Sequence, residues 1–207
     1  MTTPEVRTLV IESATEACSV ALFDGSVKVA STLEVIGRGH AERLVPMIAE
    51  LPGKGQADRI VVSLGPGSFT GVRIGLAAAR ALGLAWQVPV LGYPTLALVA
   101  AMAAETGKGG VTVCMTGGHG EWFMQDFGPD SRPENDLRSV APGAATARHA
   151  CIAGSQADAL AAAKGGTPLP LLPDAACFAQ MPADLMTASL APIYGRPPDA
   201  RLPGTAA

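Results

Sequence analysis

The stretch of residues 59–86 constrains the fold more than any other part of this sequence. It opens with an apolar, β-branched run at residues 60–62, passes through a segment with three glycines at residues 65–71, and continues as about four turns of alanine- and leucine-rich sequence. This order predicts a buried strand, a tight loop and a long helix. Such a loop either binds an anion at the start of the helix or serves only as a sharp turn.

Five residues in and after this loop are candidates for contact with a nucleotide or another anion. They are Gly65, Gly67, Ser68, Thr70 and Arg73. Either Ser68 or Thr70 can also cap the helix by accepting hydrogen bonds from its first free N–H groups. Arg73 follows the loop directly, and we expect it to do more than face solvent.

The loop lacks the residues that two common catalytic motifs require. A Walker loop has lysine after its last glycine, whereas Gly71 is followed by Val72. A hydrolase nucleophile elbow has glycine two positions before and after its serine, whereas Ser68 has Pro66 and Thr70 there. We therefore expect no catalytic residue in this loop.

The predicted helix carries small residues at a spacing of four, which forms one stripe along its surface. They are Gly71, Gly75, Ala79 and Gly83. Each interior glycine costs about 1 kcal/mol relative to alanine, so a close neighbour must offset the loss. That neighbour is either the sheet of the same domain or a helix from another chain.

Composition and cysteine positions bound the class of protein. The chain has 207 residues, of which 48% are hydrophobic and 16% are charged, so it fits one large or two small domains with a well-buried core. Four scattered cysteines and three histidines show neither zinc-site spacing nor a disulfide framework, so we expect no metal site. They are Cys18, Cys114, Cys151, Cys177, His40, His119 and His149.

The charge pattern limits the partners of the chain. The net charge is −3 and no segment clusters basic residues, so we expect the chain not to hold RNA by itself. No apolar run reaches membrane length and the first residues lack the basic start of a signal peptide. We therefore expect a cytoplasmic protein without a membrane anchor.

The order of predicted elements indicates the fold class. The first half predicts strands at residues 8–13, 18–23, 27–35, 60–64 and 88–92 and helices at residues 40–51, 68–86 and 95–104. The second half restarts with strands at residues 111–115, 121–127 and 150–153 and resembles a shortened repeat. We predict an α/β protein with an actin-like ATPase (ribonuclease H-like) fold, in which two lobes have mixed β-sheets covered by helices.

We place the lobes at residues 1–105 and 106–207, with a boundary near residues 103–110. Proline and glycine are dense toward the end of the chain. We therefore expect the tail from residue 192 onward to lie against the surface or to be partly disordered.

Three segments resemble the TsaB family, which takes part in bacterial synthesis of threonylcarbamoyladenosine on tRNA. They are SLGPGSFTGVRIG at residues 63–75, HAERLVP at residues 40–46 and PIYGRP at residues 192–197. The resemblance is strongest over residues 9–102 and thin from there to the closing segment. It implies a two-lobed actin-like fold and an accessory subunit without catalysis of its own, although related proteins were once labelled glycoprotease-like.

The resemblance also implies partners. The accessory subunit would bind the related TsaD subunit, which transfers the threonylcarbamoyl group to the adenosine next to the anticodon, and the ATPase TsaE would join the complex. Transfer RNA would be bound only through the complex. No intrinsic cofactor is implied, and ATP or ADP would lie at the partner boundary.

Two positions depart from related proteins. Actin-like ATPases place an aspartate for magnesium and phosphate where this chain has Glu12, and relatives usually have Asp-Ala-Arg where this chain has residues 116–119 with no carboxylate. Both departures weaken ATP handling by this chain alone. Glu12 nevertheless completes the set of candidate nucleotide contacts.

We expect the partner surface on the helices at residues 40–51 and 68–86, because both are more apolar than packing on one side of a sheet requires. Between residues 71 and 86 only Arg73 and Arg80 are charged. When alone, the chain would use the same face to form a homodimer. The predicted interface residues are His40, Leu44, Val45, Ile48, Ile74, Ala77, Ala78 and Ala81.

Two enzyme alternatives remain open. One is an actin-like small-molecule kinase or ATPase that uses residues 65–71 on phosphate and Glu12 on magnesium. The other is a serine hydrolase built on Ser68 with His40 or His119, although the elbow spacing does not fit. Turnover of ATP by the purified protein separates the kinase from the accessory subunit.

Overall fold

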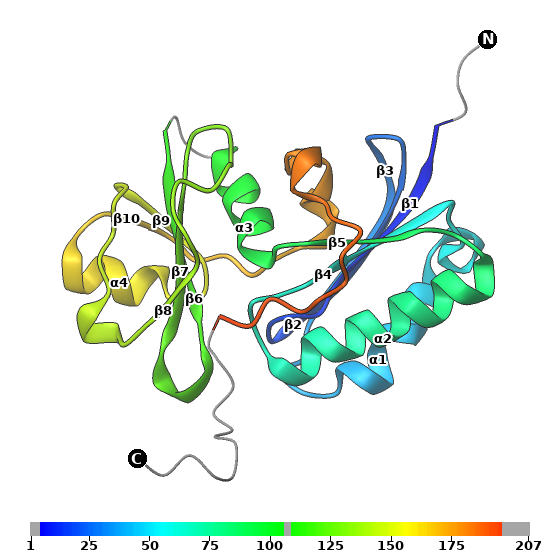
Figure 1. The fold of residues 1–207 in the computed structure, drawn as a ribbon, viewed down its shortest axis with the longest axis horizontal. Coiled ribbons are helices and arrows are strands. Elements are labelled where there is room, and N and C mark those ends of the chain that lie inside the picture. Colours follow the sequence, from blue (N-terminus) through cyan, green and yellow to red (C-terminus); the bar gives the residue numbers. More distant parts are fainter. Residues whose placement is uncertain (1–4, 106–108, 196–207) are drawn as a thin grey trace, which may run out of the picture.

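The computed structural model describes residues 5–105 and 109–195. The predicted two-lobed, actin-like layout is confirmed, because two five-stranded mixed sheets stand side by side with helices on their faces (Figure 1). The predicted boundary includes residues 106–108 and the predicted tail includes residues 196–207, which lie outside the described residues. The division into lobes at residue 105 therefore stays a prediction.

The first sheet has the strand order β3-β2-β1-β4-β5. Its strands are β1 (Arg7–Glu12), β2 (Ala17–Asp24), β3 (Val27–Val35), β4 (Arg59–Ser63) and β5 (Val90–Tyr93). The predicted antiparallel meander of the first three strands is confirmed, and β4 and β5 add to β1 in parallel. Helices α1 (His40–Glu50) and α2 (Phe69–Trp86) cover its outer face (Figure 1).

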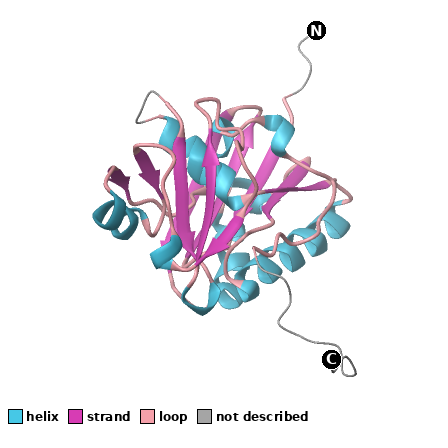
Figure 2. Cartoon of the chain, turned by 60° about the vertical axis from the view of Figure 1, so that its left-hand side comes forward, coloured by secondary structure: helices cyan, strands magenta, loops and turns pink. Residues whose placement is uncertain are grey.

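The second sheet repeats this order in smaller form. Its strands are β6 (Val111–Thr116), β7 (Trp122–Phe127), β8 (Arg138–Val140), β9 (Cys151–Ala153) and β10 (Thr167–Leu169), in the order β10-β9-β6-β7-β8. Strands β6, β7 and β8 pair antiparallel, and β9 and β10 add in parallel. The predicted shortened repeat is therefore confirmed. The single helix α4 (Ala157–Lys164) packs on its outer side (Figure 2).

Helix α3 (Thr95–Ala104) joins the lobes through a common core. Every side chain from Thr95 to Ala101 is buried, as expected for a helix that is apolar on all sides. One hydrophobic cluster contains this helix, Val61 of the first sheet and Val113 of the second. Within residues 5–105 and 109–195, none of the helices combines the length and the hydrophobicity that a bilayer crossing requires.

After β10 the chain returns to the first lobe. The short helix η4 (Ala175–Gln180) packs on β2 and β3, where the Ala175 N–H donates to the Ser19 hydroxyl at 2.9 Å. Thr187 then pairs with Gly92 at the edge of β5. Residues 190–195, which we call the C-terminal strap, continue from there to the start of α2.

Candidate functional site

The loop between β4 and α2 is packed against the loop that joins β1 to β2. The Ser68 N–H donates a hydrogen bond to the Ala14 carbonyl at 2.6 Å, and the Ser13 hydroxyl donates to the Gly71 carbonyl at 3.0 Å. A Cβ atom at Gly67 would lie 2.0 Å from the Ala14 carbonyl oxygen, and one at Gly71 would lie 2.1 Å from the Ser13 carbonyl oxygen. Close packing within the first lobe therefore requires these two glycines.

Ser68 caps α2, as predicted, because its hydroxyl accepts a hydrogen bond from the Gly71 N–H at 3.2 Å. Thr70 lies exposed in the first turn of the helix. Gly65 is buried with a φ of 88° and lies under the strap, since a Cβ atom there would be 3.1 Å from the Ile193 carbonyl oxygen. Anion binding by these loop residues stays a prediction.

The stripe of small residues on α2 faces the sheet of its own lobe. A Cβ atom at Gly75 would lie 2.3 Å from the Ser13 hydroxyl, and one at Gly83 would lie 2.4 Å from a methyl group of Val90. Ala79 is fully buried between them. Of the two neighbours considered for this stripe, the sheet of the same domain is the one observed.

Glu12 is fully buried beneath the same loop. Its carboxylate accepts hydrogen bonds from the Ala14 N–H at 2.8 Å and from the Tyr93 hydroxyl at 3.1 Å. Burial raises the pKa of this carboxyl to about 7, although the bond from Ala14 acts in the opposite direction. This position suits a group that supports the loop from below better than one that contacts a magnesium ion.

Arg73 and Arg80 both hold the C-terminal strap. The Arg73 guanidinium donates to the Tyr194 hydroxyl at 3.1 Å, and the Arg80 guanidinium donates to the Leu190 carbonyl at 3.0 Å. Arg73 thus contacts the strap, and a role for it in binding a ligand or a partner stays a prediction. Residues 192–195, the described part of the PIYGRP segment, thus lie directly on the glycine-rich segment.

A cleft of about 620 Å³ opens between the lobes at this point. Its lining comes from Gly67, Ser68, Phe69, Val72 and Arg73 of the first lobe, from Thr116, Gly117, Gly118, His119, Phe123 and Ser139 of the second, and from Ile193, Tyr194 and Gly195 of the strap. A smaller space of about 230 Å³ adjoins Ser68 and Thr116. The structure therefore brings residues 116–119 opposite the glycine-rich loop, a pairing of distant segments that local patterns do not show.

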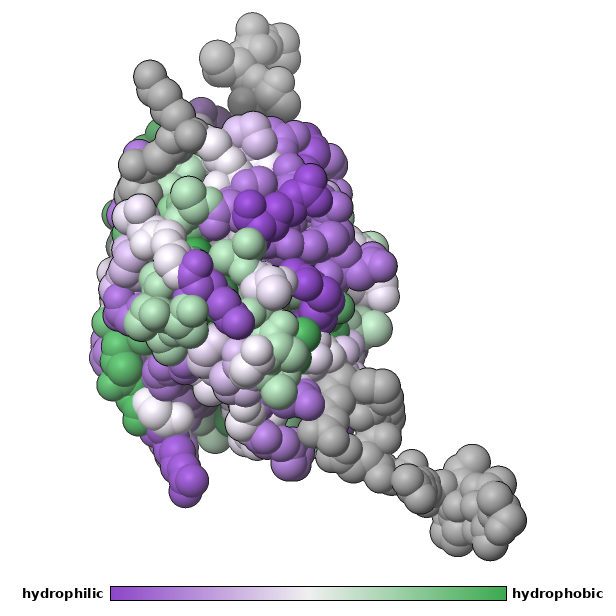
Figure 3. Space-filling model, turned by 90° about the vertical axis from the view of Figure 1, so that its left-hand side faces the viewer, coloured by the Kyte–Doolittle hydropathy of each residue, from purple (hydrophilic) through white to green (hydrophobic). Residues whose placement is uncertain are grey.

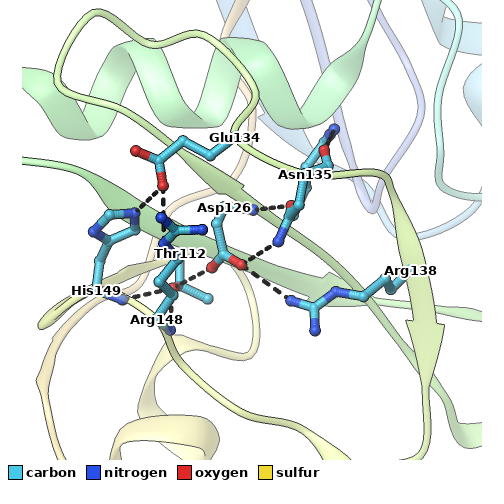
Figure 4. A network of polar contacts seen from close by, with 8 residues as sticks. Thr112, Asp126, Glu134, Asn135, Arg138, Arg148 and His149 are labelled. Atoms are coloured by element: carbon cyan, nitrogen blue, oxygen red, sulfur yellow. Dashed lines mark hydrogen bonds and ion pairs between the residues drawn. The ribbon is translucent and has the colours of Figure 1, made fainter.

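A polar network in the second lobe is formed by residues that do not line this cleft (Figure 4). The buried Asp126 carboxylate accepts hydrogen bonds from the Thr112 hydroxyl at 2.6 Å and from the Asn135 amide, and it pairs with Arg138 at 3.1 Å. Glu134 pairs with both Arg148 and His149. These contacts connect β6, β7 and the loops beside them, so the network is structural. Among the described residues, no group of three or more side chains is arranged to hold a metal ion.

The structure corrects part of the predicted partner surface. Leu44 and Ile48 are buried in the core of the first lobe, and His40 is buried with its Nε2 atom 3.3 Å from the Ala17 carbonyl oxygen. These three side chains face inward because α1 packs on the sheet through that side. Ile74 and Ala78 of α2 are half-buried.

Between the exposed charges Glu42, Glu50, Arg73 and Arg80, the outward side of the two helices carries apolar side chains. Val45, Ala77 and Ala81 of the predicted set are exposed, and Leu84, which the prediction did not include, is 82% exposed. We call Val45, Ala77, Ala81 and Leu84 the outer helix face. The second lobe differs, because the face that Figure 3 shows mixes hydrophilic and hydrophobic residues without a continuous apolar area.

Comparison with known families gives one match that covers most of the chain. A sequence model of the family TsaD, described as tRNA N6-adenosine threonylcarbamoyltransferase, matches residues 33–176. The tRNA threonylcarbamoyladenosine biosynthesis protein TsaB of Escherichia coli (strain K12) is 36% identical over 139 residues, which are 64% of this chain and 58% of that protein. The protein of the same name in Haemophilus influenzae is 38% identical over 102 residues, which are 47% of this chain and 43% of that protein. The chain thus spans about half the length of the curated relatives it matches.

Solved structures show the same likeness over a larger part of the chain. YeaZ from Pseudomonas aeruginosa superposes with a TM-score of 0.72 and 27% identity, and it covers 83% of this chain and 88% of its own. A second structure from that organism, described as an uncharacterized protein with similarity to peptidase YeaZ, has the same TM-score and 28% identity over the same shares of the two chains.

Proposed function

Because the chain belongs to the TsaD family of tRNA N6-adenosine threonylcarbamoyltransferases, and within it to the TsaB proteins, we propose that it is a non-catalytic subunit. It binds and supports a catalytic TsaD subunit during threonylcarbamoyl transfer to the adenosine next to the anticodon of tRNA. The ATPase TsaE joins this complex, and tRNA is bound only through it.

The outer helix face is the observation that carries this proposal. A surface helix ordinarily presents charged side chains to water, yet Val45 is 54% and Leu84 is 82% exposed on adjacent helices. Arg43 of α1 pairs with Glu34 and Glu50, and Arg80 of α2 donates to the Leu190 carbonyl of the strap, so neither of these charges is left unpaired beside Val45 and Leu84. What remains is an apolar face suited to helices of a second protein.

The absence of catalysis is supported by the way the glycine-rich loop is used. The space beside Gly67 and Gly71 is occupied by the neighbouring backbone of the same lobe. Ser68 caps a helix, and Glu12 is buried beneath the loop. ATP or ADP, if the complex uses it, is then held at the boundary with the partner. The subunit works in the cytoplasm, where its tRNA substrate is found, and pairs with a second copy of itself when alone.

Co-purification with the TsaD subunit of the same organism tests this proposal. We expect Leu84→Glu and Val45→Glu to abolish co-elution from a sizing column while the purified variants keep their circular dichroism spectra. Val27→Glu is the matched control, because Val27 is an equally exposed valine on β3, at 63%. Unchanged binding by both helix variants would reject the outer helix face as the partner surface.

The alternative function is an actin-like small-molecule kinase or ATPase. The cleft between the lobes is the feature that favours it, since about 620 Å³ is enough volume for a small ligand. ATP hydrolysis by the purified chain, lost in Ser68→Ala or Glu12→Gln, would establish this alternative and overturn the accessory role.

A further inference from the structure

Three planar groups are stacked at the beginning of α2, and we call Phe69, Arg73 and Tyr194 the anchor cluster. The Arg73 guanidinium carbon lies 3.5 Å from the centre of the Phe69 ring. The Tyr194 ring lies 5.7 Å from that of Phe69 at an interplanar angle of 30°, and its hydroxyl accepts the hydrogen bond from Arg73. The three groups therefore hold one another in place before any ligand arrives.

The strap fixes the position of Tyr194. On one side of it, the Ile193 N–H donates to the Leu64 carbonyl at 2.7 Å and the Ile193 side chain packs on the core of the first lobe. On the other side, Gly195 lies so close to the Phe123 ring of the second lobe that a Cβ atom there would be 2.3 Å from it. Tyr194 is thus held rigidly by contacts to both lobes.

The anchor cluster is nevertheless open to solvent. Phe69 is 56% and Tyr194 is 47% exposed, which is unusual for aromatic side chains with this much fixed structure around them. Within the described residues, the polar partner of the Arg73 guanidinium is the neutral Tyr194 hydroxyl, just as Arg80 and Arg59 donate only to neutral oxygens. By contrast, five arginines pair with carboxylates: Arg7, Arg43, Arg132, Arg138 and Arg148.

The anchor cluster continues the outer helix face. Phe69, Arg73, Ala77, Ala81 and Leu84 are exposed at spacings of three or four residues, so they lie on one side of α2. A protein that covers Ala81 and Leu84 and extends along the helix axis reaches Arg73 within about two further turns. Exposed aromatic rings and arginines are the side chains that most often dominate binding energy in protein interfaces.

We propose that the anchor cluster is the polar end of the partner interface and that Arg73 receives a carboxylate side chain of the partner protein. The proposal rests on the proposed function and adds to it the residues that contribute most to the affinity for the partner. The stacked rings hold the guanidinium with its remaining N–H groups available, so a partner carboxylate gains a charge-assisted hydrogen bond without ordering a flexible side chain.

A protein occupant fits this surface better than a nucleic acid. Phosphate backbones require several cations, yet the only charged residues of α2 are Arg73 and Arg80, and α1 presents Glu42 and Glu50 on its exposed side. The adjoining outer helix face is apolar, which matches helices of a protein subunit. We therefore assign the anchor cluster to a protein that presents an acidic side chain.

Calorimetric titration with the TsaD subunit tests the anchor cluster. Arg73→Met keeps the aliphatic stem above Phe69 but removes the charge. We expect it to raise the dissociation constant by about tenfold or more. We expect the affinity of the parent to fall between about 0.05 M and about 0.5 M salt and that of Arg73→Met to change much less. Tyr194→Phe, which loses only the hydroxyl, is expected to bind more tightly than Tyr194→Ala.

Thermal unfolding of the free variants shows whether the strap remains docked. Equal affinity and equal salt dependence of Arg73→Met and the parent would overturn the inference. If Leu84→Glu still abolishes binding in that case, the proposed function stands and only the anchor cluster is rejected. Binding of a single-stranded purine oligonucleotide that is lost in Tyr194→Ala but not in Leu84→Glu would also overturn it, because the occupant would then be a nucleic acid.

Discussion

In the first lobe the outer face of the sheet carries helices of 11 and 18 residues, whereas the second lobe carries one helix of eight residues in the same place. The strand order is the same in both sheets. In the second lobe, however, β8, β9 and β10 have only three residues each. Among the described residues, the smaller lobe therefore buries less apolar surface and presents a shorter helix to its surroundings.

The two lobes also bury their carboxylates differently. Glu12 of the first lobe is surrounded by hydrogen-bond donors without a cation, whereas Asp126 of the second lobe pairs with Arg138. The first lobe has a large apolar cluster, whereas the second lobe has a smaller apolar cluster and a polar network beside it. The two lobes therefore stabilise a buried carboxylate in different ways, by neutral hydrogen-bond donors in the first and by an ion pair in the second.

Truncating one core leucine in each lobe should give the largest effect. We expect Leu44→Ala to lower the free energy of unfolding by about 4 kcal/mol and Leu160→Ala by about 2 kcal/mol, because the smaller cluster around Leu160 relaxes more easily. Both should shift one common urea transition, since the core around α3 contains side chains of both sheets. Two separate transitions, of which each variant moves only one, would show that the lobes fold independently.

The pH dependence of stability should depend on Glu12 of the first lobe. Its pKa is about 7 in the folded chain and 4.5 without structure, so the folded state binds the proton more tightly. The contribution of this group is fully present below about pH 4.5 and is lost as the pH rises to about 7, a change of about 3 kcal/mol. We expect Glu12→Gln to remove this slope in urea unfolding. A slope that persists unchanged in the variant would assign it to other groups.

Neutralising the buried carboxylate of the second lobe should have a smaller effect. We expect Asp126→Asn to lower the free energy of unfolding by about 2 kcal/mol, because the hydrogen bond to Thr112 and the ion pair with Arg138 are disturbed. Glu134→Gln is the matched control, since its partner Arg148 is largely exposed, so the pair contributes little, and the amide oxygen of glutamine can still accept a hydrogen bond from His149. Equal losses in both variants would contradict a structural role centred on Asp126.

Elements of the first lobe were predictable because each is long enough to display its period. The strand at residues 27–35 and the helix at residues 95–104 have the predicted bounds. In the second lobe, β8, β10 and α4 were missed. Strands β8 and β10 have only three residues each, which is too short to show an alternating pattern of apolar and polar residues. The alanine run of α4 shows little contrast in hydrophobicity between its two faces.

The candidate site was less accessible to sequence reasoning. Leu44 and Val45 are adjacent and both apolar, so composition does not decide which of them faces the sheet. The contact between Arg73 and Tyr194 joins residues 121 positions apart. The position of residues 116–119 opposite the glycine-rich loop depends on the orientation of one lobe relative to the other. Local patterns identified the segments, but only the tertiary arrangement shows which of them touch.

The smallest expected effect is the loss of a helix cap, which is present at the start of α2 in the first lobe and absent at the start of α4 in the second. Ser68 accepts a hydrogen bond from the Gly71 N–H at the start of α2, whereas Gln156 makes no side-chain capping bond at the start of α4. We expect Ser68→Ala to lower the free energy of unfolding by about 1 kcal/mol, which is the usual loss of a helix cap. Gln156→Ala should remove no cap and cost less. Because the Ser68 hydroxyl caps α2 and is not part of the outer helix face, partner binding should survive Ser68→Ala in proportion to the folded fraction. A loss of partner-dependent activity without loss of stability would instead place Ser68 in direct contact with a ligand of the cleft.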